Sequence, residues 1–342
     1  MNKLLFNANQ RDKFVALFIA QLDAMQNAQL QKPWVVPLAA APANYERPTK
    51  AYLGINNMLL TMLCGVEGWK CPLFLTHKQM EKLGLSLNIE TDKDGIPTFK
   101  DNGLPQYEKP WPVVYMFISR YDKDGNKLTQ DDYDALTDDE KAACRKRWYQ
   151  KFYSEFNLGQ TNFAELYPEK WQELTALPEH PFEEGVRDEV LDAMIFGGKW
   201  RCPINFGGDR ACFSPSFDRI SLPERERFMG DAAFYGTALH EMAHSTCKAV
   251  KREIKGSFGS SDYAKEEFIA ELTAACVGAL LGVGKLLDEQ HMAYVQGWRK
   301  AICEEKDYLQ DVINAVEDAS DYFMREYNKL AKEMAAGLKA AA

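Results

Sequence analysis

Apolar residues recur at helical spacing near the start of the chain. Within residues 8–31, side chains such as Phe14, Phe18 and Leu22 are separated by polar Gln, Asn and Asp residues. A period of three to four residues predicts an amphipathic helix, and Pro33 sets its end. A second apolar stretch predicts a helix that begins near Ile55.

A shorter helix is predicted between Thr76 and Gly84. The hydroxyl of Thr76 can cap the free N–H groups of the first turn, and glycine suits the position just past a helix end.

Two segments of the first half have the composition of β-strands. Residues 112–121 are rich in β-branched and aromatic side chains, and residues 148–158 also suit a strand. Between them, residues 131–151 are dense in charged side chains and predict one exposed connecting helix, inserted near residues 129–147. We interpret Arg145-Lys146-Arg147 as a solvated face of this insertion rather than as a nucleic-acid contact.

The second half is predicted to be mostly helical, with a small sheet. A helical pattern around residues 182–196 ends at Gly197-Gly198. Three short strands are then expected, at residues 202–206, 211–215 and 218–223. Helices follow from residue 232 onward, and residues 280–342 are expected to be helical throughout. These patterns together predict an α+β protein with two domains, residues 1–160 and 161–342.

The strongest chemical signal is the sequence His240-Glu241-Met242-Ala243-His244. Residues four apart lie on one face of a helix, so the two imidazoles can bind one ion. Catalytic zinc has three protein ligands and one position for water. Zinc lowers the pKa of that water to about 7, and Glu241 can take its proton. The alternative is an ordinary amphipathic helix with two surface histidines.

The third metal ligand must come from another segment. Downstream, apolar residues such as Phe268 and Leu272 predict a second packed helix, on which Glu267 and Glu271 share a face. We predict that Glu267 is the ligand and that Glu271 accepts a hydrogen bond from a ligand imidazole. A one-residue error in helix phase would exchange these roles, so Glu266 and Glu271 remain alternative ligands.

Composition places the chain among globular proteins. It has 342 residues, of which 46% are hydrophobic, and this is enough for two cores. No run approaches the ~20 apolar residues of a membrane-spanning helix, and the start lacks the apolar core of a signal peptide. We therefore expect a cytoplasmic protein with no membrane partner.

The number and spacing of the cysteines agree with a cytoplasmic protein. The eight cysteines lack both the close pairing of a zinc knuckle and the density of a disulfide scaffold, so we expect reduced thiols. Cys247 is near the histidines, but its position on the helix indicates a packing thiol.

The net charge of −9 is unevenly distributed along the chain. Residues 1–128 contain 15 Lys and Arg against 12 Asp and Glu, whereas residues 129–342 contain 26 against 38. The excess of cations in the first part permits an anionic partner, although a solvated surface accounts for it equally well.

The chain resembles the ArdC-type antirestriction proteins, and the resemblance covers both halves. In the first half it rests on Lys32-Pro33-Trp34, Asn44, Tyr52-Leu53-Gly54-Ile55-Asn56, Leu75-Thr76-His77-Lys78-Gln79 and Phe156-Asn157-Leu158-Gly159-Gln160-Thr161. In the second half it rests on residues 213–223, 240–244, 266–271 and 294–298.

In this family, a domain that binds single-stranded DNA precedes a zincin-like metallopeptidase domain, carried by plasmids, phages and related mobile elements. The resemblance implies a gluzincin-like zinc site in residues 161–342 and a DNA-binding domain in residues 1–160. The chain departs from the family in two places. Ser245-Thr246-Cys247 replaces the usual tryptophan and Gly-His after the motif, and the acidic insertion is larger than expected.

Single strands are held by cations and by aromatic rings on which bases stack. With the resemblance, this chemistry makes candidates of six residues in the first domain, namely Lys32, Trp34, Arg47, Lys50, Tyr52 and Lys78. Zincin architecture also suggests that an edge strand within residues 211–222 pairs with an extended peptide. Tyr263 and Tyr235 are candidates to stabilise the oxyanion.

The function predicted from the sequence is a zinc metallopeptidase coupled to a single-stranded-DNA-binding domain, with Glu241 as the general base and a protein or peptide as substrate. The alternative is a non-proteolytic, DNA-binding antirestriction protein with a structural or vestigial zinc site.

Overall fold

The computed structural model describes residues 6–27, 41–92, 94–176, 187–228, 230–256, 260–283, 292–305 and 307–341. Within these ranges the chain forms two compact units. One contains Leu75–Phe156, and the other contains Leu5–Phe74 together with Asn157–Ala342. Helices are combined with short sheets, so the α+β class is confirmed.

The first unit is built on a long antiparallel pair, β3 (Trp111–Tyr121) and β5 (Arg145–Asn157). β4 (Lys127–Leu128) pairs with the far end of β3. The predicted strands at residues 112–121 and 148–158 are thereby confirmed, and β5 begins three residues earlier than expected.

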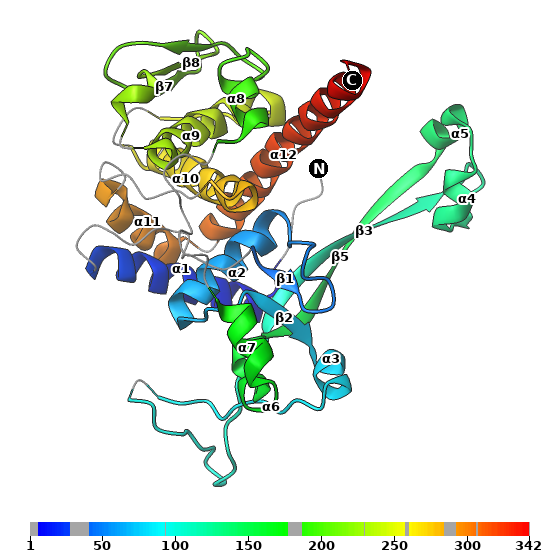
Figure 1. The fold of residues 1–342 in the computed structure, drawn as a ribbon, viewed down its shortest axis with the longest axis vertical. Coiled ribbons are helices and arrows are strands. Elements are labelled where there is room, and N and C mark those ends of the chain that lie inside the picture. The colour runs from blue at the N-terminus through cyan, green and yellow to red at the C-terminus, as the bar shows by residue number, and fades with distance from the viewer. Residues whose placement is uncertain are drawn as a thin grey trace. The chain divides into compact units, whose positions relative to one another are not determined.

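The charged insertion differs from its prediction. Instead of one helix it forms two short ones, α4 (Gln130–Asp134) and α5 (Asp138–Ala143), at the far end of the β3–β5 arm (Figure 1). Each begins at a threonine whose side chain accepts a backbone hydrogen bond: Thr129 caps α4 and Thr137 caps α5. Because Thr137 caps a new helix after the turn that follows α4, the insertion is divided into two helices. Residue 145 then begins β5.

The short predicted helix is present as α3 (His77–Lys82), and Thr76 caps it as expected. After Gly84, which adopts a positive φ of 67°, residues 85–92 and 94–110 contain successive turns. These turns are joined by isolated bridges, including one between Ile89 and Tyr107.

The second unit contains the N-terminal helices α1 (Ala8–Asn27) and α2 (Gly54–Glu67) and the short strand β1 (Ala43–Asn44). β1 pairs in parallel with Leu73 and Phe74, the first half of β2 (Leu73–Thr76). Phe18 of α1 packs edge-on against Phe268, at a centroid distance of 5.9 Å. Helices α1 and α2 therefore pack with the C-terminal helices. The predicted domain boundary near residue 160 stays a prediction.

A small mixed sheet precedes the motif helix. Its strands are β6 (Ile204–Phe206), β7 (Cys212–Ser214) and β8 (Arg219–Leu222), in the order β6-β8-β7. β8 pairs in parallel with β6 and antiparallel with β7, so β7 forms one edge. The three strands predicted from the sequence are all present. Short helices of this unit outside the motif region are α6 (Phe163–Leu166), α7 (Pro168–Thr175) and α8 (Glu189–Ile195).

Two long helices carry the histidine motif and the downstream glutamates. α9 (Asp231–Val250) and α10 (Ser261–Leu281) lie against each other (Figure 1). Ser260 caps α10, and Gly282 ends it with a left-handed φ of 70°. Residues 266–278 of α10 are all buried, so this helix lies in the interior rather than on the surface.

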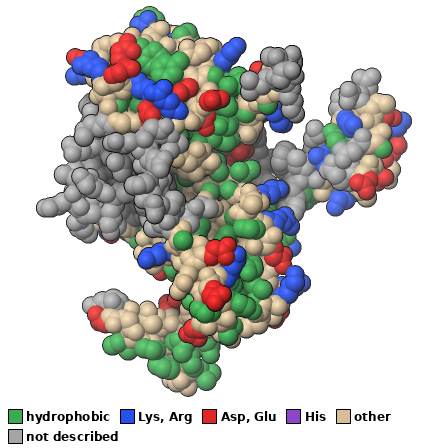
Figure 2. Space-filling model, viewed as in Figure 1, with side chains coloured by type: hydrophobic (Ala, Val, Ile, Leu, Met, Phe, Trp, Pro, Cys, Tyr) green, Lys and Arg blue, Asp and Glu red, His purple; other side chains and the backbone are tan. Residues whose placement is uncertain are grey.

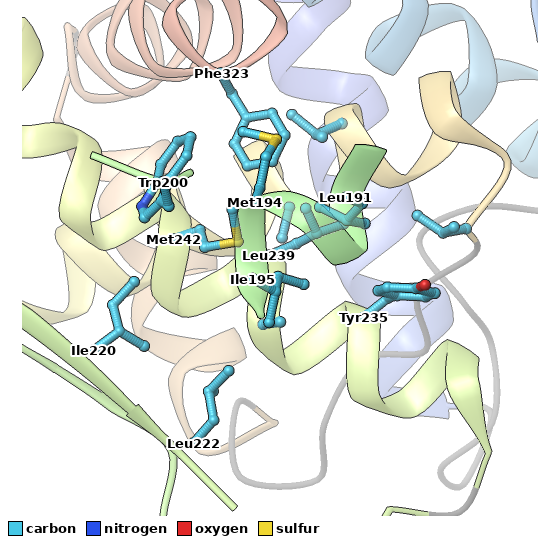
Figure 3. Close-up of a cluster of buried hydrophobic side chains, with 14 of the residues drawn as sticks. Leu191, Met194, Ile195, Trp200, Ile220, Leu222, Tyr235, Leu239, Met242 and Phe323 are labelled. Carbon is cyan, nitrogen blue, oxygen red and sulfur yellow. The ribbon is translucent and has the colours of Figure 1, made fainter. Parts of the chain in front are cut away.

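A hydrophobic core supports the motif helix from behind. Leu239 and Met242 of α9 pack with residues of α8, the small sheet and the last helix, including Leu191, Met194 and Phe323 (Figure 3). Fully burying one such side chain contributes roughly 1.5–3 kcal/mol. This core therefore fixes the rotation of α9 about its axis, and with it the direction of the histidines.

The C-terminal part is not one continuous helix. After α10 ends, α11 (Met292–Glu304) and α12 (Tyr308–Ala341) follow. Among the described residues, no helix combines the length and apolar character that a bilayer crossing requires. All eight cysteines lie in described segments, and most of them are buried. The expectation that they are reduced stays a prediction.

Candidate metal centre

α9 presents both motif histidines to one point in the protein interior. His240 and His244 are buried, with 4% and 8% of their surface exposed. Their Nε2 atoms are 3.1 Å apart, and their rings are nearly perpendicular. A surface helix with two solvated histidines, the alternative considered from the sequence, is not what the structure contains.

Glu267 of α10 closes the third side. Its Oε2 lies 3.3 Å from Nε2 of His240, and its Oε1 lies 3.6 Å from Nε2 of His244. Ligand atoms of the three residues all lie within 4.8 Å of one another. Two nitrogens bound tetrahedrally to zinc at 2.0–2.1 Å would be about 3.3 Å apart, close to the observed nitrogen separation.

The outer nitrogens of both rings face carboxylates. Nδ1 of His240 lies 3.2 Å from Oε2 of Glu271, and Nδ1 of His244 lies 3.0 Å from Oε1 of Glu266. A carboxylate at Nδ1 keeps the proton there and leaves the lone pair of Nε2 for a metal. Two nitrogen lone pairs and a carboxylate therefore converge in a buried space, and this donor set fits a divalent cation.

Arg252, just past the end of α9, supports this arrangement and was not singled out from the sequence. Its guanidinium donates to both oxygens of Glu266, and Nη2 also donates to the carbonyl of Ala243 at 3.2 Å. Lys251 adopts a left-handed φ of 57°, which ends the helix and turns the chain toward Arg252. The only hint in the sequence was an arginine following the motif helix.

Charge interactions are strong in this buried cluster. Burial by itself would raise the pKa of Glu267, but hydrogen bonds with His240 and His244 lower it well below the ordinary value. Burial would likewise raise the pKa of Glu266, and His244 with Arg252 lowers it. Both carboxylates are thus ionised at neutral pH.

Glu241 is buried in α9 between the two histidines in sequence, and its charge helps to raise the pKa of His244. The role of Glu241 as a general base stays a prediction, as do the ligand roles of His240, His244 and Glu267. All three glutamates lie at the histidines. Glu266 is at Nδ1 of His244, Glu271 is at Nδ1 of His240, and Glu267 is at the Nε2 atoms of both rings.

The two oxyanion candidates are placed differently. The hydroxyl of Tyr235 donates to Asp192 at 2.7 Å and accepts from the backbone N–H of Asp188, in the core behind α9. That engagement argues against a role for Tyr235 at a substrate carbonyl. Tyr263 is half-buried in the first turn of α10, four residues before Glu267. It remains a candidate to stabilise the oxyanion.

The DNA-binding candidates that the structure describes differ in their exposure to solvent. Lys32 and Trp34 lie outside the described residues. Arg47, Lys50 and Lys78 are exposed, whereas Tyr52 is buried, with 8% of its surface exposed. A base cannot stack on a ring inside the core, so the proposal for Tyr52 is corrected.

Ser245, Thr246 and Cys247, which follow His244 in α9, are buried. Ser245 accepts a hydrogen bond from Nε1 of Trp200 at 2.8 Å and donates to the carbonyl of Met242. Cys247 is also buried, in agreement with its interpretation as a packing thiol. These contacts join α9 to the core rather than to the ligand atoms.

Comparison with protein families finds two matches in this chain. Residues 8–154 match the N-terminal domain of the anti-restriction factor ArdC, and residues 192–315 match a zincin-like metallopeptidase family.

Two solved structures are similar over almost the whole chain. The antirestriction ArdC protein of plasmid R388, in its metal-free form, gives a TM-score of 0.59 at 23% identity, covering 95% of this chain and 99% of that one. The Mn(II)-bound form of the same protein gives 0.59 at 24% identity, covering 94% and 98%.

Curated relatives include a DNA primase TraC of Escherichia coli, 32% identical over 328 residues, or 92% of this chain. The chain spans only 20% of that relative's length. An uncharacterised protein, y4eC of Sinorhizobium fredii, is 24% identical over 80% of this chain and 78% of its own length.

Proposed function

We infer the function of this chain from its family: it is an ArdC-type protein, in which an ArdC N-terminal domain precedes a zincin-like metallopeptidase domain. We propose that it is a zinc-dependent metallopeptidase of the antirestriction type, encoded on a mobile element, whose N-terminal domain binds single-stranded DNA. The observation that carries the peptidase proposal is the convergence of ligand atoms from His240, His244 and Glu267.

In this proposal His240, His244 and Glu267 hold the ion through the two Nε2 atoms and one carboxylate. A zinc ion there would polarise the scissile carbonyl and lower the pKa of a water molecule. The similar ArdC structure that contains Mn(II) supports a divalent metal in this fold. A set of two imidazole nitrogens and one carboxylate favours zinc.

Glu241 is the proposed general base. It follows His240 directly in α9, so its carboxylate is carried by the same rigid helix as the ligands. Glu241 would accept the proton of the attacking water and then donate it to the leaving amine. Glu271 and Glu266 hold the imidazoles in the tautomer that binds the ion, and Tyr263 remains the candidate to stabilise the oxyanion.

The substrate of this site is proposed to be a protein or peptide in extended form. β7 is an edge strand of the small sheet and lies against α9, as β8 does. An extended segment pairing with the outer edge of β7 would run along the motif helix.

Replacing Glu241 with Gln tests the mechanism. The amide of the new side chain cannot take a proton, so cleavage should fall by about 10²–10⁴-fold while zinc content stays at the parent level. Glu253→Gln, at an exposed carboxylate, is the matched control. Cleavage is read by comparing new protein N-termini in hosts that produce the parent or the variant.

Unchanged cleavage in Glu241→Gln would remove this residue from the mechanism. If that variant loses cleavage but still protects DNA from a restriction enzyme as well as the parent, the non-proteolytic alternative is the better account of the antirestriction role.

A further inference from the structure

The pairing of β3 with β5 gathers tyrosines and cations on one face of the arm. Side chains alternate between the two faces of a sheet, and residues directly opposite each other share a face. Tyr115 is opposite Lys151, and Tyr121 is opposite Arg145. Tyr149 and Tyr153 lie two residues to either side of Lys151 and therefore share its face. We call these six residues the tyrosine face: Tyr115, Tyr121, Tyr149, Tyr153, Arg145 and Lys151.

The side chains of the tyrosine face contact one another in a continuous series. The rings of Tyr115 and Tyr153 meet edge to face at 5.1 Å, and Nζ of Lys151 lies 4.8 Å from the centre of the Tyr153 ring. Farther along, the hydroxyls of Tyr121 and Tyr149 are 3.2 Å apart. Rings and cations thus follow each other along the strands instead of forming a closed core.

The opposite face of the arm is occupied near its far end. Arg120, which lies on that face, packs its guanidinium 4.3 Å from the centre of the Tyr133 ring of α4. The tyrosine face remains accessible: Tyr149 has 45% of its surface exposed, and Arg145 and Lys151 are exposed as well.

We propose that the tyrosine face binds single-stranded nucleic acid, with bases stacked on the tyrosines and phosphates near Arg145 and Lys151. The inference rests on the proposed function, to which it adds the surface that contacts DNA. Aromatic rings interleaved with cations are the two elements that single-strand binding needs, because every base has a face for stacking and every nucleotide carries a negative charge.

The charge around the tyrosine face limits where the strand can lie. Acidic side chains gather at the far end of the arm, over α4 and α5 (Figure 2), and include the exposed Asp131 and Asp132. Phosphates would be repelled there. The bound strand therefore lies along β5 between Tyr153 and Arg145 and turns away before the tip.

Tyr149→Ala tests the stacking. Binding of a fluorescent 20-nucleotide oligo-dT to the full chain is measured by anisotropy, with the melting temperature recorded for each variant. Loss of one stacked base should weaken binding roughly 5- to 150-fold. Tyr149→Phe keeps the ring and should bind like the parent. Tyr107→Ala removes a tyrosine of similar exposure from residues 85–110 and is the matched control.

Lys151→Gln tests the phosphate contact. Because each phosphate that a protein neutralises on a single strand contributes about 0.7 to the salt dependence, this variant should lower the slope of log affinity against log salt by about 0.7. Tyr149→Ala should leave that slope unchanged. Lys100→Gln, at an exposed lysine of the same unit, is the control.

The surface proposal is overturned if folded Tyr149→Ala and Lys151→Gln bind oligo-dT like the parent, or if the parent binds duplex DNA more tightly than oligo-dT. It also fails if the parent binds no oligonucleotide, which would then remove DNA binding from the proposed function. Peptide cleavage and zinc content are measured separately, so the peptidase proposal stands or falls independently of these results.

Discussion

Arg252 holds Glu266 by two hydrogen bonds of 2.9 Å, from Nε to Oε2 and from Nη2 to Oε1. The same carboxylate lies 3.0 Å from Nδ1 of His244. Arg252, which lies beyond the end of α9, therefore fixes the orientation of His244 within that helix by holding Glu266 of α10. His240 is oriented by Glu271 instead, whose carboxylate belongs to the same helix as Glu266.

Replacing Arg252 with Gln should weaken zinc binding by about 10- to 100-fold, the usual effect of losing a group that supports a metal ligand. The metal-free protein should also lose about 3–5 kcal/mol of stability, since the buried carboxylate of Glu266 loses its partner. Chelator competition measures the affinity, and Lys255→Gln, at an exposed cation, should change neither quantity.

The three glutamates of α10 can be ranked by their effect on metal content. Glu267→Gln should remove the metal, because Glu267 faces both Nε2 atoms. Glu271→Gln should keep the metal with affinity lowered about 10- to 100-fold, because its contact is with the outer nitrogen of His240. Metal analysis of the two purified variants checks this order. Metal loss from Glu271→Gln together with full content in Glu267→Gln would reverse the assignment.

Metal affinity should rise with pH across the neutral range. Burial by itself lowers the pKa of His244, but hydrogen bonds with Glu266 and Glu267 raise it to about 10. Below that pH the metal-free protein carries a proton that the ion must displace. Affinity should therefore increase about tenfold per pH unit between about pH 7 and 9, with one proton released per ion. Calorimetry in buffers of different ionisation enthalpy counts the protons, and a flat profile would contradict the prediction.

Gly278 marks a close approach within the second unit. A Cβ atom there would lie 2.8 Å from the carbonyl oxygen of Val283, so Gly278→Ala should destabilise the protein by about 1–3 kcal/mol. Gly297, in α11, has no atom near its Cβ position, and Gly297→Ala should be neutral or stabilising by up to about 1 kcal/mol. Chemical denaturation of both variants gives the comparison. Equal stability changes would contradict it.

Local pattern was sufficient for most single elements. Helical period predicted α1, an apolar stretch predicted α2, and a composition rich in β-forming residues predicted β3. The cap at Thr76 was predicted from the residue type alone. The insertion was predicted as one helix because its charge density concealed two separate caps. Thr129 with Asp132, and Thr137 with Glu140, each satisfy the N-terminal capping pattern.

The candidate metal site could be located from the sequence, but its supporting contacts could not. The spacing of His240 and His244 determines that they share a helix face, and the same rule places Glu267 with Glu271. How α10 is rotated against α9 is set by packing across the core. For that reason the contact of Glu266 with His244, and the pairing of Arg252 with Glu266, follow only from the tertiary structure.

The proposed nucleic-acid surface depends even more on tertiary structure than the metal site does. Arg145 was interpreted as part of a solvated helix, because nothing local indicated that β5 starts there. Tyr121 and Tyr149 are 28 positions apart, and only the pairing of β3 with β5 brings their hydroxyls together. Tyr52, by contrast, was selected for its residue type and proved to be buried.

The ladder between β3 and β5 also restricts how this part of the chain can vary during evolution. A one-residue shift of this segment of β5 against β3 would turn Tyr149, Lys151 and Tyr153 to the side that now carries Arg120. Homologues that keep this face should therefore differ in strand length by pairs of residues, or accommodate an odd one in a bulge, whereas the helical tip beyond Tyr121 is free to grow or shrink.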